Sequence, residues 1–540
     1  MRKSPRLARL PRCLLFGRHR SNRAIGIWTA AILAMIFPAG QALGKKQDKI
    51  SVERRQADDT FACGGHVERE TWRLWETGVR DWARKSLGDR LKRDGDVYVL
   101  YDLQTYLQNL SSMARRCQRI GRLMEIASVL RPAYESLEPG GWLSPGRRWV
   151  CRGGRICSGN AGLLGQEVQL VSLQFLGLAS SVANALATAQ RPLQEDAQAF
   201  ITTTSIVIAE HMQRWGDRKA IDKLADAAGA KPEDLKPMST GLLFTDKPLW
   251  MIGIYAEWAG ILESGHESVK LHLPDDHERE ALARHLRVLL RFFNARLSYR
   301  NMQHPQFGEV KIAELDRGYW RFFSDHRYAG YEGKEKPLVC PDKNKARADG
   351  VDAGAAPQQR IDAASVPRPN DIGWDLSHAR RLVPVLDALD RNRDAMAKMF
   401  EVRESELPPG DLALRFANAL AVLSWNGDRR QPLFSNYLSG ANGWYRVGYA
   451  SGGGCNEGTP PFGLSESFVT GGYAVWGRVQ PAVRQVGRRL YQMTSQAGNA
   501  ETQEGGFIAR YYPGFSTSAP PMGKTLSNVM FLPSLVGVAE

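Results

Sequence analysis

The sequence predicts an all-α protein whose helical hairpins wind into a closed double ring, an (α/α)6-type toroid with long loops. Three observations favour this fold. Apolar residues recur at helical spacing along most of the chain. The segments 166–188, 199–213 and 248–263 are apolar on nearly every side, as expected of helices that are buried all round. Runs with the period-two alternation of strands are sparse.

The expected elements follow from this spacing. Residues 70–92 are amphipathic, with Trp72, Trp75, Val79 and Trp82 at helical spacing. Further helices are expected at 101–130 (one or two helices), 166–188, 199–213, 248–263, 277–299, 376–402, 411–424, 464–478 and 480–495. Long loops with Gly, Pro and aromatic residues are expected at 137–165, 300–375, 426–463 and 504–525. Loops of that length usually carry function in a compact domain.

Two other helical architectures are alternatives to the ring. An α-solenoid needs a sequence repeat of about 34–45 residues, and none is visible. Two packed helical bundles are the second alternative. The inner helices that are apolar all round, together with amphipathic outer ones, favour the double ring.

The first 44 residues are typical of a secretory signal peptide. Residues 1–23 carry eight Lys and Arg residues and no acid, an apolar run follows at 24–38, and Ala42-Leu43-Gly44 offers small residues for a signal peptidase. The apolar run is shorter than the about 20 residues of a membrane span. We therefore expect an exported protein, periplasmic or secreted. The alternative is an uncleaved N-terminal anchor, in which case the chain would contact a membrane.

Residues 45–540 have the composition of a globular protein, with 43% hydrophobic and 24% charged residues in the whole chain. We expect a single domain with a flexible excursion at 341–370, which is rich in Ala, Asp and Pro. The formal net charge of +15 becomes +7 without the eight charges of residues 1–23. This mild positive charge favours anionic partners weakly, and it does not predict a nucleic-acid-binding protein.

The cysteines favour disulfide bonds, because six of the seven remain after the signal peptide and an even number is typical of exported proteins. The expected pairs are Cys63–Cys117, Cys151–Cys157 and Cys340–Cys455. Free buried thiols are the alternative. A zinc site is disfavoured because no Cys-x-x-Cys or His-x-x-x-His pair stands out, and we expect no metal and no cofactor.

Two stretches that mix polar and aromatic residues predict where the functional site lies. They read Tyr-Trp-Arg-Phe-Phe-Ser-Asp-His-Arg-Tyr-Ala-Gly-Tyr-Glu at 319–332 and Asp-Ile-Gly-Trp-Asp-Leu-Ser-His-Ala-Arg at 371–380. A packed core does not need carboxylate, imidazole and guanidinium groups, because buried charges are costly unless they are paired. A cleft that holds a polar, ring-shaped substrate does need them.

The loops Tyr328-Ala329-Gly330-Tyr331-Glu332 and Trp374-Asp375-Leu376-Ser377-His378-Ala379-Arg380, in a helical chain, resemble those of the six-hairpin glycosidase-like superfamily. The resemblance covers residues 65–500 as architecture. It implies an α/α toroid and an exported enzyme that acts on a carbohydrate polymer or oligosaccharide, as a glycoside hydrolase or a polysaccharide lyase. It assigns no particular family and no catalytic residue.

A glycoside hydrolase is the first functional prediction. Such an enzyme places two carboxylates beside the scissile bond, and Glu332 and Asp375 are the expected pair, with Glu457 in reserve. Asp375 also stands where a helix N-cap is expected, so it has a structural alternative. Aromatic rings that can stack on sugar faces are Trp320, Tyr331, Trp374, Trp425, Trp444 and Tyr445.

A polysaccharide lyase is the second prediction. A tyrosine or histidine then removes the proton beside a uronate carboxylate, while Arg or Asn neutralises that carboxylate. The candidate bases are Tyr319, His326 and His378, and the candidate carboxylate-binding or substrate-binding residues are Arg321, Arg380, Asn436 and Arg446. A third prediction, from another class, is a non-catalytic glycan-binding or cell-envelope scaffold protein.

Overall fold

The computed structural model describes most of the chain between residues 60 and 538. The described residues are 60–141, 146–160, 162–231, 243–270, 275–316, 333, 335–340, 358–359, 372–447, 456–496 and 502–538. The chain divides into a unit of residues 1–55, which lies outside the described part, and a unit of residues 56–540. The expected signal peptide at 1–44 and nearly all of the excursion at 341–370 fall outside the described residues.

The prediction of a mainly helical protein is confirmed, with 64% helix and 7% strand. The helices that carry the architecture are α2 (His66–Leu74), α3 (Arg80–Lys85), α4 (Tyr98–Arg116), α5 (Ile120–Leu130), α6 (Arg155–Ser158), α7 (Gln169–Ala187), α8 (Glu195–Trp215), α9 (Arg218–Gly229), α10 (Asp246–Glu263), α11 (Glu267–Lys270), α12 (Asp276–Arg296), α14 (Leu376–Ala379), α15 (Leu382–Arg391), α16 (Arg393–Phe400), α17 (Leu412–Ala419), α18 (Glu466–Thr470), the 3-10 helix η9 (Tyr473–Arg478), α19 (Pro481–Gln496), α20 (Gln503–Tyr511) and α21 (Pro521–Leu535). Short π-helical segments at Trp75–Val79, Ser86–Arg93 and Leu420–Ser424 extend their neighbours.

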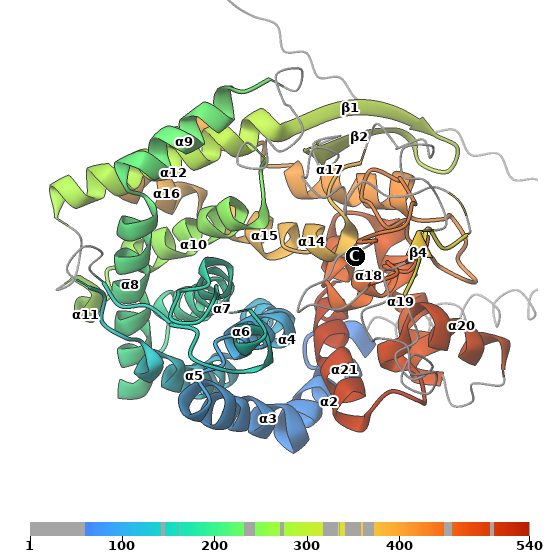
Figure 1. The fold of residues 1–540 in the computed structure, drawn as a ribbon, viewed down its shortest axis with the longest axis horizontal. Coiled ribbons are helices and arrows are strands. Elements are labelled where there is room, and N and C mark those ends of the chain that lie inside the picture. Colours follow the sequence, from blue (N-terminus) through green and yellow to red (C-terminus); the bar gives the residue numbers. More distant parts are fainter. Residues whose placement is uncertain are drawn as a thin grey trace, which may run out of the picture. The chain divides into compact units, whose positions relative to one another are not determined.

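Six elements contact one another in a closed succession. α4 packs on α7, α7 on α10, and α10 on α15. α15 contacts η9, η9 contacts α21, and α21 returns to α4 (Figure 1). The approach of α7 to α10 is close, because a Cβ atom added at Gly177 would lie 2.6 Å from the ring of Trp250. Further helices pack outside this succession, with α8 against α7, α12 against α10 and α19 against η9.

Strands β1 (Leu297–His304) and β2 (Gly308–Leu315) correct two sequence predictions. They form an antiparallel hairpin where we expected the end of a helix and the start of a long loop. The turn between His304 and Gly308 has three residues, and Gly308 takes the left-handed conformation that such turns require, with φ of 67°. The first half of β2 is exposed or partly exposed and its last four residues are all buried. The strand therefore lacks the alternation of buried and exposed residues that predicts a strand from sequence.

Five further helices, α6, α9, α11, α20 and α21, lie where the sequence predicted none. α9 has a short apolar face, of which only Ala227 is fully buried while Leu224 and Ala228 are partly buried, so its pattern is weaker than that of the core helices. α20 and the start of α21 occupy the expected loop at 504–525. Pro521 begins α21 in a position that tolerates proline, although proline reads as a loop signal in the sequence.

Two of the three expected disulfides are confirmed. Cys63 bonds to Cys117 and Cys151 to Cys157, with Cα–Cα distances of 5.5 Å and 5.9 Å. Cys340 is also disulfide-bonded, while its expected partner Cys455 lies outside the described residues. Disulfides persist in oxidising compartments, which agrees with an exported protein.

One helix in the described part of the chain is long and apolar enough to cross a membrane. It is α7, and 89% of its most apolar window is buried inside the protein. A core helix of a globular protein passes the same test, and the burial of α7 between α4 and α10 gives it that role.

Candidate functional site

The second polar–aromatic stretch enters the site as the short helix α14. Residues 374–376 pair with 436–438 like two strands: the amide of Leu376 donates to the Asn436 carbonyl at 2.9 Å, and Leu438 donates to the Trp374 carbonyl at 2.9 Å. The helix starts immediately afterwards, with Asp375 as its N-cap. This pairing fixes the direction in which α14 leaves the loop region.

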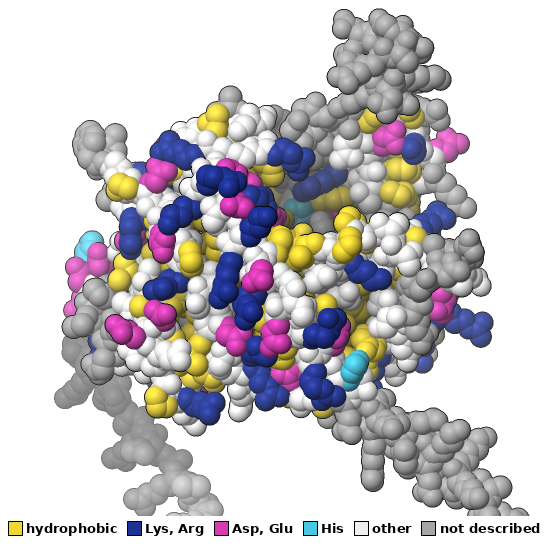
Figure 2. Space-filling view, turned by 90° about the horizontal axis from the view of Figure 1, so that it is seen from below, with side chains coloured by type: hydrophobic (Ala, Val, Ile, Leu, Met, Phe, Trp, Pro, Cys, Tyr) yellow, Lys and Arg dark blue, Asp and Glu magenta, His cyan; other side chains and the backbone are white. Residues whose placement is uncertain are grey.

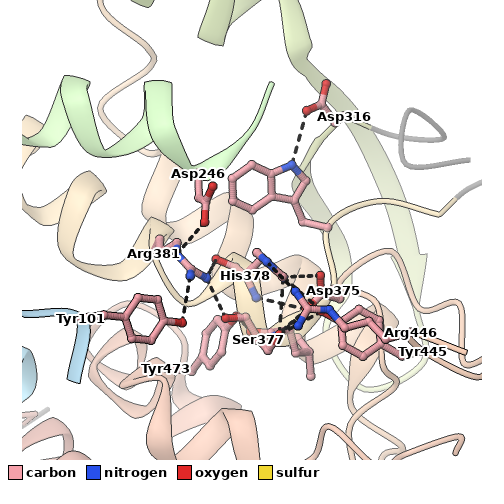
Figure 3. Close-up of polar contacts among 12 residues, drawn as sticks. Tyr101, Asp246, Asp316, Asp375, Ser377, His378, Arg381, Tyr445, Arg446 and Tyr473 are labelled. Atoms are coloured by element: carbon pink, nitrogen blue, oxygen red, sulfur yellow. Dashed lines mark hydrogen bonds and ion pairs between the residues drawn. The ribbon is translucent and has the colours of Figure 1, made fainter. Parts of the chain in front are cut away.

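Asp375 and His378 form the central polar pair of the site (Figure 3). Asp375 Oδ2 lies 2.7 Å from His378 Nδ1. Asp375 Oδ1 accepts from the Ser377 hydroxyl at 2.5 Å, from the Ser377 amide at 3.0 Å and from the His378 amide at 3.1 Å. The carboxylate is therefore both a helix cap and the partner that orients the imidazole.

Burial separates the roles of these two residues. The side chain of Asp375 is 1% exposed, whereas that of His378 is 14% exposed. Burial by itself raises the pKa of Asp375, but the charge and hydrogen bonds of His378, with Ser377 and Arg446, outweigh it and lower the pKa to about 2. Asp375 is thus a carboxylate at neutral pH that does not reach solvent, and His378 is the group of the pair that a ligand can touch.

Tyr445 and Arg446 approach His378 from a second loop. The Tyr445 hydroxyl lies 3.3 Å from His378 Nδ1, and Arg446 Nη2 lies 3.4 Å from His378 Nε2. Tyr445 is held by paired backbone bonds with Thr459 at 2.8 Å and 2.7 Å. Arg446 has a φ of 57°, a left-handed conformation that is strained for a residue other than glycine. Such strain is concentrated at functional sites, where the surrounding structure enforces it.

Arg381 supports α14 from the side of the core. Its Nη1 donates to the Ser377 carbonyl at 3.0 Å and lies 3.4 Å from that of His378. Its Nε lies 3.3 Å from Asp246 of α10, and its Nη2 lies 3.4 Å from the hydroxyl of Tyr101 of α4. Figure 3 shows this guanidinium between the three elements. Helices α4 and α10 thereby set the position of the His378 backbone.

The structure corrects several predicted substrate contacts. Asn436 is fully buried, and its side-chain amide donates to the carbonyls of Gly443 and Pro460 at 2.9 Å and 2.8 Å. Trp374 is 1% exposed and its indole donates to Asp316 at 3.4 Å. The indole hydrogen bond and the surrounding core account for this ring, so it does not offer a face to a sugar.

Two other predicted aromatic contacts are also buried. Trp444 is 4% exposed, and its indole donates to the Gly333 carbonyl at 3.1 Å. Trp425 is 7% exposed. Both rings are packed because the loops of this region are folded tightly onto the helices, which a count of tryptophans in the sequence does not show.

The described hydrogen bonds and ion pair of Glu457 are with residues other than His378. Its carboxylate lies 2.5 Å from Lys336 Nζ and accepts from the amide of Cys340 at 3.2 Å. It ties the 335–340 segment to the loop that carries Glu457, as the expected Cys340–Cys455 bond would. The described contacts of Glu457 are structural, and its reserve catalytic role stays a prediction.

Arg380 points away from His378 toward α4, where its Nη2 donates to Thr105 Oγ1 at 3.1 Å. This hydrogen bond is with α4, the side chain is partly buried, and the role of Arg380 as a substrate contact stays a prediction. The remaining predicted residues lie outside the described part of the chain: Tyr319, Trp320, Arg321, His326, Tyr331, Glu332 and Cys455.

Sequence reasoning missed Asp316, a fully buried carboxyl at the end of β2. Burial raises its pKa to about 8, although Trp374 and Arg296 act in the opposite direction. The Arg296 Nε atom lies 3.7 Å away. Asp316 lies shortly before the aromatic stretch 319–332. A single acidic residue at that position is the sequence feature that could have identified it. Tyr101, Asp246 and Arg381 gave no such signal, because their contacts join distant parts of the chain.

The arrangement can move a proton and hold an anion. With Nδ1–H donated to Asp375, His378 Nε2 carries a lone pair that faces the Arg446 guanidinium. Within the described ranges no group of three or more His, Cys, Asp or Glu side chains is placed to hold a metal ion. No protein-family model matches the chain, and comparisons with curated proteins and with solved structures gave no match.

Proposed function

We propose that this protein is an exported polysaccharide lyase that cleaves a uronate-containing glycan by β-elimination, with His378 as the base. One observation carries the proposal: a partly exposed imidazole is bonded through Nδ1 to a buried carboxylate and faces an arginine at Nε2. A base next to a cation is what removal of a proton beside a carboxylate requires.

The proposed reaction needs only these residues. Nε2 of His378 takes the proton from the sugar carbon that bears the carboxylate, and the electron pair forms the new carbon–carbon double bond. The bond to the glycosidic oxygen breaks, and the imidazolium returns its proton to that oxygen. Arg446 stabilises the negative charge that grows on the carboxylate, while Asp375 stabilises the imidazolium.

Glycoside hydrolysis, our first prediction from the sequence, is the second candidate. It needs two carboxylates that reach the scissile bond. Asp375 is buried and bound by Ser377 and His378, which weighs against it as one of the pair. One observation bears on Glu332, the other predicted carboxylate, which itself lies outside the described residues. The carbonyl of its neighbour Gly333 accepts a hydrogen bond from the indole of Trp444, which is next to Tyr445.

The toroid is part of the same proposal. The closed succession of α4, α7, α10, α15, η9 and α21 supports an inner ring of six elements, with α8, α12 and α19 in an outer layer. His378 at the start of the α14–α15 region and Arg446 in a long loop would then lie at one end of the ring. Export to the periplasm or medium is supported by the disulfides.

The product distinguishes the candidate functions. The purified protein is incubated with polymannuronate, polyguluronate, polygalacturonate and glucuronate-containing glycosaminoglycans. A lyase releases products with the ultraviolet absorbance of an unsaturated uronate, whereas a hydrolase yields new reducing ends without that absorbance. Binding without either product would support the non-catalytic glycan-binding alternative.

The His378→Gln variant tests the base. We expect kcat to fall by about 10²–10⁴-fold, with an unchanged melting temperature. His277→Gln is the matched control, because His277 is an exposed histidine at the start of α12. Full activity of His378→Gln on a substrate that the wild type cleaves would overturn the assignment.

A further inference from the structure

Arg380 is partly buried between α4 and the start of α15. Its side chain donates to Thr105, and its stem is packed so closely that a Cβ atom added at Gly471 would lie 2.8 Å from the Cβ of Arg380. In the described part of the chain no carboxylate lies within ion-pair distance of this guanidinium. A partly buried guanidinium without a carboxylate partner can donate charge-assisted hydrogen bonds to a bound anion.

Two arginines near Arg380 have carboxylate partners, as does Arg115, whereas Arg116 of α4 donates to the backbone carbonyls of Val536 and Pro533. Arg381 pairs with Asp246 at 3.3 Å. Arg115 and Arg391 share Asp387, at 2.5 Å and 3.1 Å. Burial and the charge of Arg381 lower the pKa of Arg380, while Tyr101 acts in the opposite direction.

A small polar cavity lies against Arg380. Its volume is about 20 Å³, and its lining includes Gln104, Thr105, Gln108, Asn109, Arg380 and Thr470. That volume suits one or two water-sized particles. The lining, as far as the described chain extends, has no carboxylate and offers N–H and O–H donors. Gln104 donates to Gln108 Oε1 at 3.5 Å, and in the described residues the Gln108 amide N–H groups donate to no other side chain.

We propose that this cavity binds a single halide-sized inorganic anion, chloride under ordinary conditions, against the Arg380 guanidinium. The donor-rich lining supplies its hydrogen bonds, and the anion supplies the negative charge that the described neighbours of Arg380 lack. The volume of about 20 Å³ fits a halide better than a sugar or a bulky organic anion. The site is separate from the proposed reaction, since Arg380 extends to α4 rather than to His378.

Thermal unfolding of the purified protein tests the proposal without any substrate. The melting temperature is measured against increasing sodium chloride or sodium bromide, with sodium gluconate making up constant ionic strength. We expect the halides to raise the melting temperature in a saturable way, by on the order of 2 °C. Equal melting temperatures in halide and gluconate would overturn the proposal, whatever the outcome of the lyase assay.

Two variants connect the effect to Arg380. Arg380→Gln removes the charge, so we expect its melting temperature not to respond to halide. Arg415→Gln is the control, because Arg415 is ion-paired with Asp411 on α17 and distant from the cavity lining, and it should respond as the wild type does. A halide response that persists in Arg380→Gln contradicts the site.

Crystals of the wild-type protein soaked in bromide give a readout that does not depend on the folding of a variant. We expect an anomalous peak within hydrogen-bond distance of the Arg380 guanidinium. Bromide bound only at surface positions would overturn the assignment.

Discussion

The Asp375→Asn substitution tests the central pair of the site. Asn is as good a helix N-cap as Asp, so the substitution removes the negative charge and keeps most of the cap. The folded-state pKa of Asp375 is about 2, against an ordinary value of 3.8. Because one pKa unit is worth about 1.4 kcal/mol, the charge stabilises the folded protein by about 2 kcal/mol at neutral pH.

The sign of the pH dependence follows from the lowered pKa. The unfolded chain binds a proton at Asp375 more readily than the folded protein does, so this stabilisation is fully present above about pH 4 and is lost as the pH falls toward 2. Urea unfolding at a series of pH values measures it. We expect the difference in unfolding free energy between wild type and Asp375→Asn to be about 2 kcal/mol at pH 7 and to shrink below pH 4.

The same variant should lose activity far more than stability. Without the carboxylate, His378 no longer has its Nδ1 proton fixed, and the equivalent change in a Ser-His-Asp triad costs about 10⁴-fold in kcat. Asp217→Asn at the exposed cap of α9 is the control and should change neither quantity. Within the described residues the Asp217 side chain accepts one hydrogen bond, from the Ala220 amide, and Asn can accept it too. An Asp375→Asn protein with wild-type stability at every pH would refute the pairing.

Two further predictions concern stability alone. Burial raises the pKa of Asp316 to about 8, so the folded protein holds this proton more tightly than the unfolded chain and loses stability as the pH rises from about 4 to 8. Asp316→Asn should therefore be more stable than wild type at pH 9, by roughly a few kcal/mol, and the difference should vanish near pH 4; a constant difference in urea unfolding would contradict it. Replacing Cys63 and Cys117 by Ser opens a loop with a sequence separation of 54 and should cost about 4 kcal/mol, against about 2 kcal/mol for Cys151 and Cys157 with a separation of 6. Equal losses in chemical denaturation would show that loop entropy does not govern these bonds.

Helices with a strong burial pattern were predictable from the sequence. α7 and α10 are buried on nearly every side. Their long, nearly continuous apolar sequences predict helices that are surrounded by other helices. α9 was not predictable in this way, because Ala227 is its one buried residue. The β1–β2 hairpin was missed for a related reason: most residues of β1 are partly exposed, so the strand lacks a clean alternation.

The site was predictable only where its residues are close in sequence. The spacing of Asp375 and His378 places both at the first turn of α14, which the sequence indicates through the N-cap pattern. The approach of Arg446 depends instead on the loop fold around Asn436, whose side chain binds three backbone groups. No periodic pattern encodes such a loop. For the same reason Asn436, which looks like a binding residue in the sequence, has a structural role.

The positive charge around the start of α15 is relevant to both the proposed catalytic site and the proposed anion site. Three guanidinium groups, of Arg380, Arg381 and Arg446, surround the start of α15. Two carboxylates, of Asp246 and Asp375, compensate part of that charge. Among these five groups the excess charge is positive. It is spread over two places, because Arg446 faces the partly exposed His378 while Arg380 lines the small polar cavity. A substrate carboxylate can neutralise the first but is too large for the second. An inorganic anion at Arg380 therefore does not compete with a glycan carboxylate at Arg446.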